Sequence, residues 1–258
     1  MFDLPLIKNK TSLATLDFQE ETASTNDRAI ELIRSGKLTA SEIPTLVLTA
    51  KQTAGRGQRS HKWWSGEGSL TFTYIQSADD ISPLASLAVA VSIAEAIEAQ
   101  SPLRNLKIKW PNDILCDGRK LCGILIETTA FQDQRFMIIG IGINANNESV
   151  STEELETLDQ ESKHAIQPTS IRIESGQPTN LNALLIDLIA RLDNLNNDKE
   201  VVERANERLA FRDEQVRVAQ PSQAEFIAKC NSIDGKGHLV VTVDGESRLI
   251  ASATIRPL

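Results

Sequence analysis

The sequence has few aromatic residues, few cysteines and no long hydrophobic run. Aromatic residues make up 4% of the 258 residues. No window approaches the roughly 18 uninterrupted apolar residues of a membrane-spanning helix, and the start MFDLPLIKNK lacks the apolar core of a signal peptide. We therefore expect a soluble, cytoplasmic protein without contact to a membrane.

The only cysteines are Cys116, Cys122 and Cys230, and no CxxC spacing occurs. Their odd number and scattered positions favour free thiols in a reducing compartment over disulfides or a zinc site. The three histidines, at positions 61, 164 and 238, are also scattered, which argues against a histidine-based metal site.

Positive charge is in short supply as well, because 27 basic residues face 35 acidic ones and the net charge is −8. This balance disfavours a general electrostatic attraction to nucleic acid. The length allows a full hydrophobic core, and we expect one large domain with a small appendage.

The hydrophobic pattern predicts strands and helices in mixed order. Residues 1–14 are polar and unpatterned and are expected to form a loose arm. Strands are predicted at 15–20, 45–51, 69–76, 106–109, 121–127 and 135–146, and helices after Ser24 and at 84–100, 149–163, 181–195 and 200–209. Four short alternating strands follow, at 215–219, 225–233, 238–243 and 249–253, and predict a small β-barrel.

The stretch 109–127, KWPNDILCDGRKLCGILIE, predicts an active-site hairpin. Pro111 restricts the backbone after a short strand, and Asn112 and Asp113 place an amide and a carboxylate beside a hydrophobic return strand. A DG pair supplies the turn, and Lys120 stands just past it. The hairpin thus carries several charges on a scaffold with little freedom to move.

A second candidate site is the loop 52–64, QTAGRGQRSHKWW. Two glycines with basic residues between and after them suit a loop whose backbone N–H groups approach an anion closely. A solvated surface loop is the alternative. Trp63 and Trp64 weaken that alternative, because such rings normally need a partner that covers them.

Two further stretches carry polar groups next to apolar runs. Ser24, Thr25 and Asn26 precede an apolar stripe and predict a helix start, where a hydroxyl can cap the helix and also bond a ligand. The sequence GIGIN at 140–144 predicts a buried strand whose glycines leave space either for a ligand or for close strand packing.

KWPNDI followed by KLCGILIE, with eleven positions from lysine to lysine, resembles the central motif of the biotin protein ligases. The loop 52–68 resembles the family signature GRGRxGRxWxSPxG, and STN and GIGIN resemble two further family motifs. The resemblance is close over 24–146. It implies an α/β (α+β) fold: a mixed, largely antiparallel sheet flanked by helices, like that of class II synthetases, at 1–210, and an SH3-like β-barrel at 211–258.

In these ligases the carboxylate of biotin attacks the α-phosphate of ATP, and a lysine of a biotin carboxyl carrier domain then attacks the resulting acyl-adenylate. The resemblance implies Mg²⁺ with ATP as co-substrate and no tightly bound prosthetic group. It assigns catalysis to Lys120, Arg56 and Lys109, and places Mg²⁺ at Asp113. Biotin is expected at Ser24, Thr25, Asn26, Gln52, Gly55, Arg56, Gly57, Trp63, Lys120 and Gly123, and ATP at Arg59, Trp63, Lys109, Asn112, Asp113 and Asn144.

The chain departs from the signature at Gln58, Ser60, His61 and Gly66, where the family usually has arginine, glycine, arginine and proline. Two alternatives therefore stay open: a lipoate or octanoate ligase or transferase of the same fold, and a weakly catalytic biotin-binding paralogue. The expected form is monofunctional, without an N-terminal DNA-binding domain and without binding to DNA. A homodimer is also left open.

Overall fold

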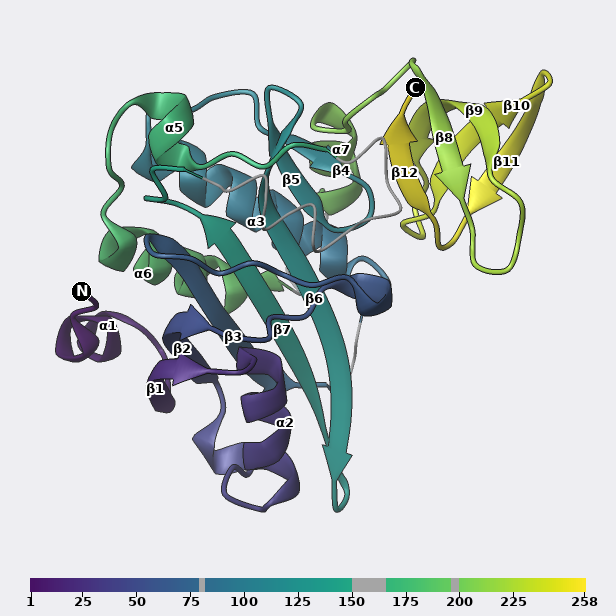
Figure 1. Ribbon diagram of the computed structural model, residues 1–258. Coiled ribbons are helices and arrows are strands. Elements are labelled where there is room, and N and C mark those ends of the chain that lie inside the picture. Colours follow the sequence, from purple (N-terminus) through teal and green to yellow (C-terminus); the bar gives the residue numbers. More distant parts are fainter. Residues whose placement is uncertain (79–81, 150–165, 196–199) are drawn as a thin grey trace.

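The computed structural model describes residues 1–78, 82–149, 166–195 and 200–258 (Figure 1). Its larger sheet has seven strands in the order β1-β2-β3-β7-β6-β5-β4, and only the β1–β2 pair is parallel. Its strands are β1 (Thr15–Thr22), β2 (Thr45–Gln52), β3 (Ser69–Ser77), β4 (Lys107–Lys109), β5 (Asp113–Cys116), β6 (Arg119–Phe131) and β7 (Gln134–Asn144). The predicted mixed, largely antiparallel sheet is confirmed.

Helices cover both faces of this sheet. On one face lies α2 (Thr25–Arg34), which packs on β2, β3, β6 and β7, and on the other lie α3 (Ala85–Gln100) and α6 (Leu181–Leu192) (Figure 1). The alternation of side chains along a strand explains this division. Leu46 and Leu48 of β2 face the α3 side, whereas Val47 between them packs beneath α2. The expected helix at 149–163 falls almost entirely outside the described residues.

A second, five-stranded antiparallel sheet follows the helix α7 (Val201–Glu207). Its strands are β8 (Gln215–Ala219), β9 (Phe226–Ile233), β10 (Leu239–Val243), β11 (Glu246–Ile250) and β12 (Thr254–Pro257), in the order β11-β10-β9-β8-β12. The small C-terminal β unit is confirmed, although β11 begins earlier than expected and β12 was not foreseen. The domain boundary near residue 210 stays a prediction.

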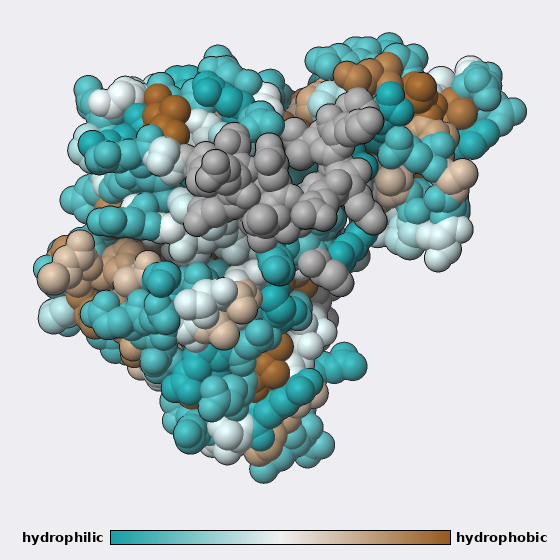
Figure 2. All heavy atoms as spheres, in the orientation of Figure 1, coloured by the Kyte–Doolittle hydropathy of each residue, from teal (hydrophilic) through white to brown (hydrophobic). Residues whose placement is uncertain are grey.

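The surface in Figure 2 is mostly hydrophilic, and hydrophobic residues gather on it chiefly over the C-terminal sheet. Exposed apolar side chains there include Ile227 and Leu249. Among the described residues, no helix combines the length and the apolar character needed to cross a bilayer.

The expected loose arm at 1–14 is wrong, because it contains the helix α1 (Leu4–Lys10). Asp3 caps this helix by accepting a hydrogen bond from the backbone N–H of Leu6 at 2.9 Å. Ile7 is fully buried in the main core, and α1 packs against α6. A short helix of this kind is stable only when docked, and its docking partner lies about 180 residues later in the chain.

We predict that Ile7→Ala lowers the free energy of unfolding by about 2–4 kcal/mol, because the substitution leaves a cavity between α1 and the core. Leu6→Ala is the matched control, since Leu6 lies on the same helix but is 39% exposed. Urea denaturation measures both. Equal, small losses for the two variants would show that α1 contributes nothing to the core.

Candidate active site

A cavity of about 280 Å³ lies on the α2 side of β6 and β7 and reaches the end of the C-terminal sheet. It brings together residues from separate stretches of the chain, from Ser24 near the N-terminus to Arg256 near the C-terminus. Of the predicted site residues, those that line it are Ser24, Thr25, Asn26, Gln52, Arg56, Gly57, Arg59, Trp63, Lys109, Asn112, Asp113, Lys120, Gly123 and Asn144. Gly55 lies behind the wall, where its carbonyl accepts a hydrogen bond from the backbone N–H of Trp63 at 2.8 Å.

One part of the cavity wall carries neutral polar groups. Ser24 caps α2 through a 3.4 Å hydrogen bond from the backbone N–H of Asp27, so its cap role and its position on the wall coexist. The backbone N–H and hydroxyl of Thr25 both donate to Oε1 of Gln52, at 2.8 and 3.2 Å. Gln52 is thereby held with its acceptor occupied and its amide N–H₂ group left to serve a ligand.

Another part of the wall carries two lysines that share one carboxylate. Asp113 is 6% exposed, and its two oxygens lie 2.8 Å from the ammonium of Lys109 and 2.8 Å from that of Lys120. Burial alone would raise the pKa of Asp113, but the two ammonium groups outweigh burial and lower that pKa to about 2. Strands β4, β5 and β6 thus present one net positive charge from three groups that two ion pairs connect.

Arg56 reaches the cavity from the glycine-rich loop and is also paired. Its Nη1 and Nη2 donate to Oε1 and Oε2 of Glu127, at 3.1 and 2.8 Å. Nη2 also lies 2.7 Å from Asp27. The hydrogen bond to Glu127 is the main cause of a raised pKa of Arg56. The guanidinium therefore stays charged and is held firmly between α2 and β6.

Trp63 lies flat against the middle strands, and glycine makes this possible. A Cβ at Gly142 would come within 2.3 Å of the Trp63 ring, and one at Gly123 within 2.9 Å. The ammonium of Lys120 stands 5.6 Å from the ring centroid. The indole N–H of Trp63 and Oδ1 of Asn144 are both buried without a hydrogen-bond partner. Because unpaired buried polar groups are costly, the indole N–H of Trp63 and Oδ1 of Asn144 are suited to bind polar groups of a ligand.

Known proteins resemble this chain in sequence and in fold. A sequence model described as "Biotin/lipoate A/B protein ligase family" matches residues 18–144, the segment that carries most of the cavity wall. Residues 18–144 are therefore similar in sequence to the biotin/lipoate A/B protein ligase family.

Individual relatives cover different shares of the chain. The biotin--[acetyl-CoA-carboxylase] ligase of Mycobacterium tuberculosis is 28% identical over 253 residues, which are 93% of this chain and 88% of that protein. The bifunctional ligase/repressor BirA of Bacillus spizizenii is 42% identical over 139 residues, 52% of this chain. The chain spans 41% of that relative's length.

The fold extends the likeness beyond the matched segment. The solved structure of the biotin protein ligase from Aquifex aeolicus in complex with biotin and ATP superimposes with a TM-score of 0.74 and 23% identity. The match covers 93% of this chain and 97% of that one, so the C-terminal sheet is included in the shared fold.

The loop residue Gln58, where this family usually has arginine, lines the cavity. Its neighbour Arg59 has a left-handed backbone with φ of 53° and turns toward the C-terminal sheet. The guanidinium of Arg59 donates to Thr254 at 2.5 Å and to Ser252 at 3.0 Å. Arg59 therefore ties the loop 52–64 to the C-terminal sheet, and the nucleotide contact predicted for it stays a prediction.

Asp113 does not fit a Mg²⁺ ion in this arrangement, because two ammonium groups already occupy both of its oxygens. A divalent cation there would face two positive charges at contact distance. Oδ1 of Asn144 has no hydrogen-bond partner and is an oxygen of the kind that hard cations bind. A single amide oxygen is too few ligands to hold Mg²⁺. Any Mg²⁺ is better treated as part of the ATP co-substrate than as an ion held by Asp113.

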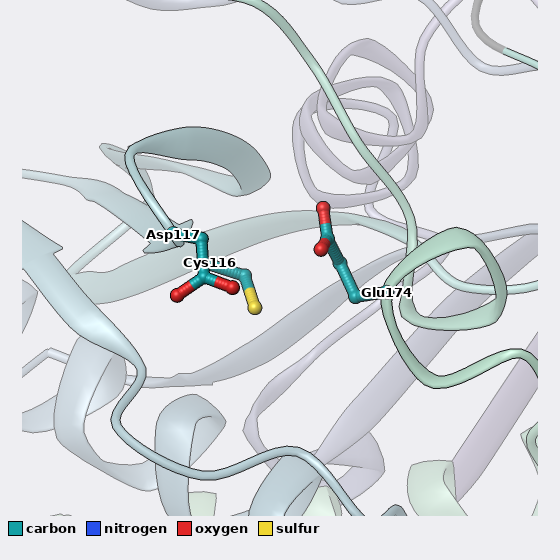
Figure 3. A group of neighbouring side chains, drawn as sticks. All are labelled: Cys116, Asp117 and Glu174. Atoms are coloured by element: carbon teal, nitrogen blue, oxygen red, sulfur yellow. The ribbon is translucent and has the colours of Figure 1, made fainter.

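Elsewhere in the described part of the chain, Cys116, Asp117 and Glu174 bring possible ligand atoms within 4.8 Å of one another. Figure 3 shows the cysteine and aspartate at one turn and the glutamate across from them. Glu174 is already bonded to Arg119 at 2.6 Å, and burial is the main cause that raises the pKa of the Cys116 thiol to about 11. A protonated thiol and a paired carboxylate are poor metal ligands. All three cysteines are free, as expected.

Sequence reasoning did not assign Asp27 or Glu127 to the site, although both contact Arg56. It also missed the cavity residues contributed by 166–168 and by Ala253, Thr254 and Arg256. Glu127 ends the hydrophobic run of the central motif. A carboxylate at the end of such a run could have indicated a partner for one of the cationic residues of the site. The sequence of the C-terminal strands gives no sign that Ala253, Thr254 and Arg256 line the cavity. Their alternating pattern predicts strands but not where those strands pack.

We predict that Asp113→Asn lowers stability at pH 7 by about 2 kcal/mol, since the pKa falls from 3.8 to about 2 on folding and each unit is worth about 1.4 kcal/mol. Because the pKa of Asp113 is lower in the folded state, the carboxylate stabilises the fold at pH values above its unfolded pKa of 3.8. This contribution is lost as the pH falls toward 2. The difference between parent and variant should therefore shrink between about pH 4 and pH 2. Chemical denaturation across this range measures it, with Glu21→Gln as the control for an exposed pair. A difference independent of pH would contradict the assignment.

Proposed function

We propose that the protein is an ATP-dependent biotin--[biotin carboxyl-carrier protein] ligase that forms biotinyl-5′-AMP and transfers biotin to a lysine of a carrier domain. The observation that carries the proposal is the mixed lining of the cavity. Neutral donors and acceptors from Ser24, Thr25 and Gln52 line it together with the cations of Lys109, Lys120 and Arg56. This combination suits a ligand that carries both a ureido ring and a carboxylate, and a triphosphate that meets the carboxylate.

The first step brings two anions together, so the site has to neutralise charge and align the reactants. A carboxylate oxygen of biotin attacks the α-phosphorus, the bond to the β-phosphate breaks, and pyrophosphate leaves with Mg²⁺. Lys120 is the cation that we assign to the developing charge, because its long flexible side chain can follow that charge. Lys109 supports it from the other side of Asp113.

The second step needs no nucleophile from this chain. The amine of the carrier lysine attacks the acyl carbon, a proton is lost from nitrogen, and AMP leaves. Trp63 and Asn144 supply the unpartnered donor and acceptor that we assign to the nucleotide end, together with Asn112. Gly57 and Gly123 keep the backbone close to the reacting groups. We further propose that the reaction takes place in the cytoplasm, where carrier domains are made.

Transfer of labelled biotin to a purified biotin carboxyl carrier domain, with ATP and Mg²⁺, tests the function. A parallel incubation with lipoate separates the two acids that the family name covers. Biotin-dependent release of pyrophosphate and labelling of the carrier lysine are expected. Labelling with lipoate instead, or biotin binding without pyrophosphate release, would replace the proposal with a lipoate ligase or a binding protein.

We predict that Lys120→Ala lowers the rate of adenylate formation by about 10²- to 10³-fold while biotin binding changes little, because the charge is needed most where negative charge develops. Rapid-quench measurement of pyrophosphate, together with calorimetric biotin binding, separates the two effects. Unchanged pyrophosphate release in the variant would remove Lys120 from the chemistry.

A second prediction concerns Gln58. A neutral amide forms hydrogen bonds of about half the strength of a guanidinium, and Arg59 is engaged by the C-terminal sheet. The adenylate should therefore dissociate faster than from a variant with arginine at position 58. Gln58→Arg should slow adenylate release by several-fold and suppress labelling of bystander lysines at high biotin. Equal off-rates for the parent and Gln58→Arg would show that Gln58 is neutral.

A further inference from the structure

Arg56 is held by two carboxylates that differ in their surroundings. Glu127 makes two hydrogen bonds to the guanidinium and is 27% exposed, whereas Asp27 makes one contact and is 51% exposed. Neither carboxylate lines the cavity, but Arg56 does. One positive and two negative charges therefore meet at the point where an anionic ligand is expected.

Glu127 also orients a second cavity residue. Its Oε2 accepts a hydrogen bond from Nδ2 of Asn26 at 2.8 Å, in addition to the one from Arg56. Oδ1 of Asn26 accepts from the buried hydroxyl of Thr73 at 2.6 Å, and the amide lies so close to Gly140 that a Cβ there would come within 2.3 Å of it. Asn26 thus has little freedom, and Glu127 connects this fixed amide to the guanidinium of the loop.

Charge decides which contact can give way. The three groups carry one net negative charge, so an anion can bind Arg56 favourably only if a carboxylate releases it. Releasing Arg56 from Glu127 would break two hydrogen bonds. If Glu127 itself moved away, the Nδ2 of Asn26 would keep only its longer bond to the carbonyl of Leu125 at 3.3 Å. Releasing Asp27 breaks one contact of a half-exposed side chain that water can solvate.

We propose that Glu127 is a positioning residue that fixes Arg56 and Asn26 relative to each other, and that Asp27 is a placeholder which the phosphate of the nucleotide displaces from Arg56. This inference rests on the proposed function. It assigns opposite effects to two carboxylates that contact the same guanidinium. Net charge alone would predict the same effect for both, because neutralising either one makes the site less negative.

The test compares Glu127→Gln and Asp27→Asn by the KM for ATP at saturating biotin and by the Kd for biotin. Glu127→Gln should raise both constants roughly three- to tenfold, since a neutral amide with one oxygen cannot accept all of the hydrogen bonds that Arg56 and Asn26 donate to the carboxylate. Asp27→Asn should lower the KM for ATP roughly two- to fivefold at low ionic strength, less in 0.5 M salt, and leave the Kd for biotin unchanged. Glu31→Gln, on the same helix and paired only with Arg28, is the charge-matched control.

Glu127→Asp keeps the negative charge but shortens the side chain by one methylene. It should therefore raise the KM for ATP and the Kd for biotin, as Glu127→Gln does. It also provides a second variant if Glu127→Gln does not fold, and thermal unfolding of each variant checks folding. A lower KM for ATP in both Glu127→Gln and Asp27→Asn would overturn the inference, because net charge alone would then explain both variants. An unchanged KM for ATP and Kd for biotin in both Glu127 variants would overturn the positioning role of Glu127. A parent protein that binds biotin but releases no pyrophosphate would instead reject the proposed function.

Discussion

The structure depends on the pairing of each central cation in the cavity with a carboxylate of the protein. Asp113 holds Lys109 and Lys120, and Glu127 and Asp27 hold Arg56. Without Asp113, the ammonium groups of Lys109 and Lys120 would repel each other and move apart. The carboxylates keep them in place, so the ligand meets cations whose positions are already set. Such preorganisation is what electrostatic catalysis requires.

The sheet makes this arrangement possible by its geometry. The antiparallel pairing of β5 with β6 sets Asp113 opposite Gly123, so the carboxylate lies next to the strand that carries Lys120. Glycines on β6 and β7 remove the side chains that would keep Trp63 away from the strands. The long strand β6 then extends to Glu127 and brings the second group of charges to the same face of the sheet. One rigid strand therefore carries parts of both charge clusters.

Much of the fold followed from local patterns. The strands of the main sheet other than β5, and the helices α2, α3 and α6, match the expected ranges within a few residues, because their apolar periodicity or long apolar runs are continuous. The four-residue strand β5 had no expected range of its own. The helix α1 was missed because its stability comes from burial of Ile7 against distant residues. The shift of β11 and the unforeseen β12 have a similar cause, since pairing with β10 and β8 fixes their ranges.

Almost every residue that the motifs assigned lines the cavity, but residues 166–168, Ala253, Thr254 and Arg256 line it too and belong to none of the motifs. The motifs also did not reveal that Asp113 bonds two lysines or that Arg59 reaches Thr254, because these contacts depend on how strands and loops far apart in sequence meet. The expected Mg²⁺ site at Asp113 required a free carboxylate, but in the structure this carboxylate is paired with Lys109 and Lys120.

A crystal structure of the protein with a non-hydrolysable analogue of biotinyl-5′-AMP tests the central claim most directly. The account predicts that the ligand fills this cavity, that Arg56 contacts the phosphate and still contacts Glu127, and that Asp113 still holds Lys109. Binding of the analogue outside this cavity, or in it with Arg56 bonded to both carboxylates and not to the phosphate, would contradict the account.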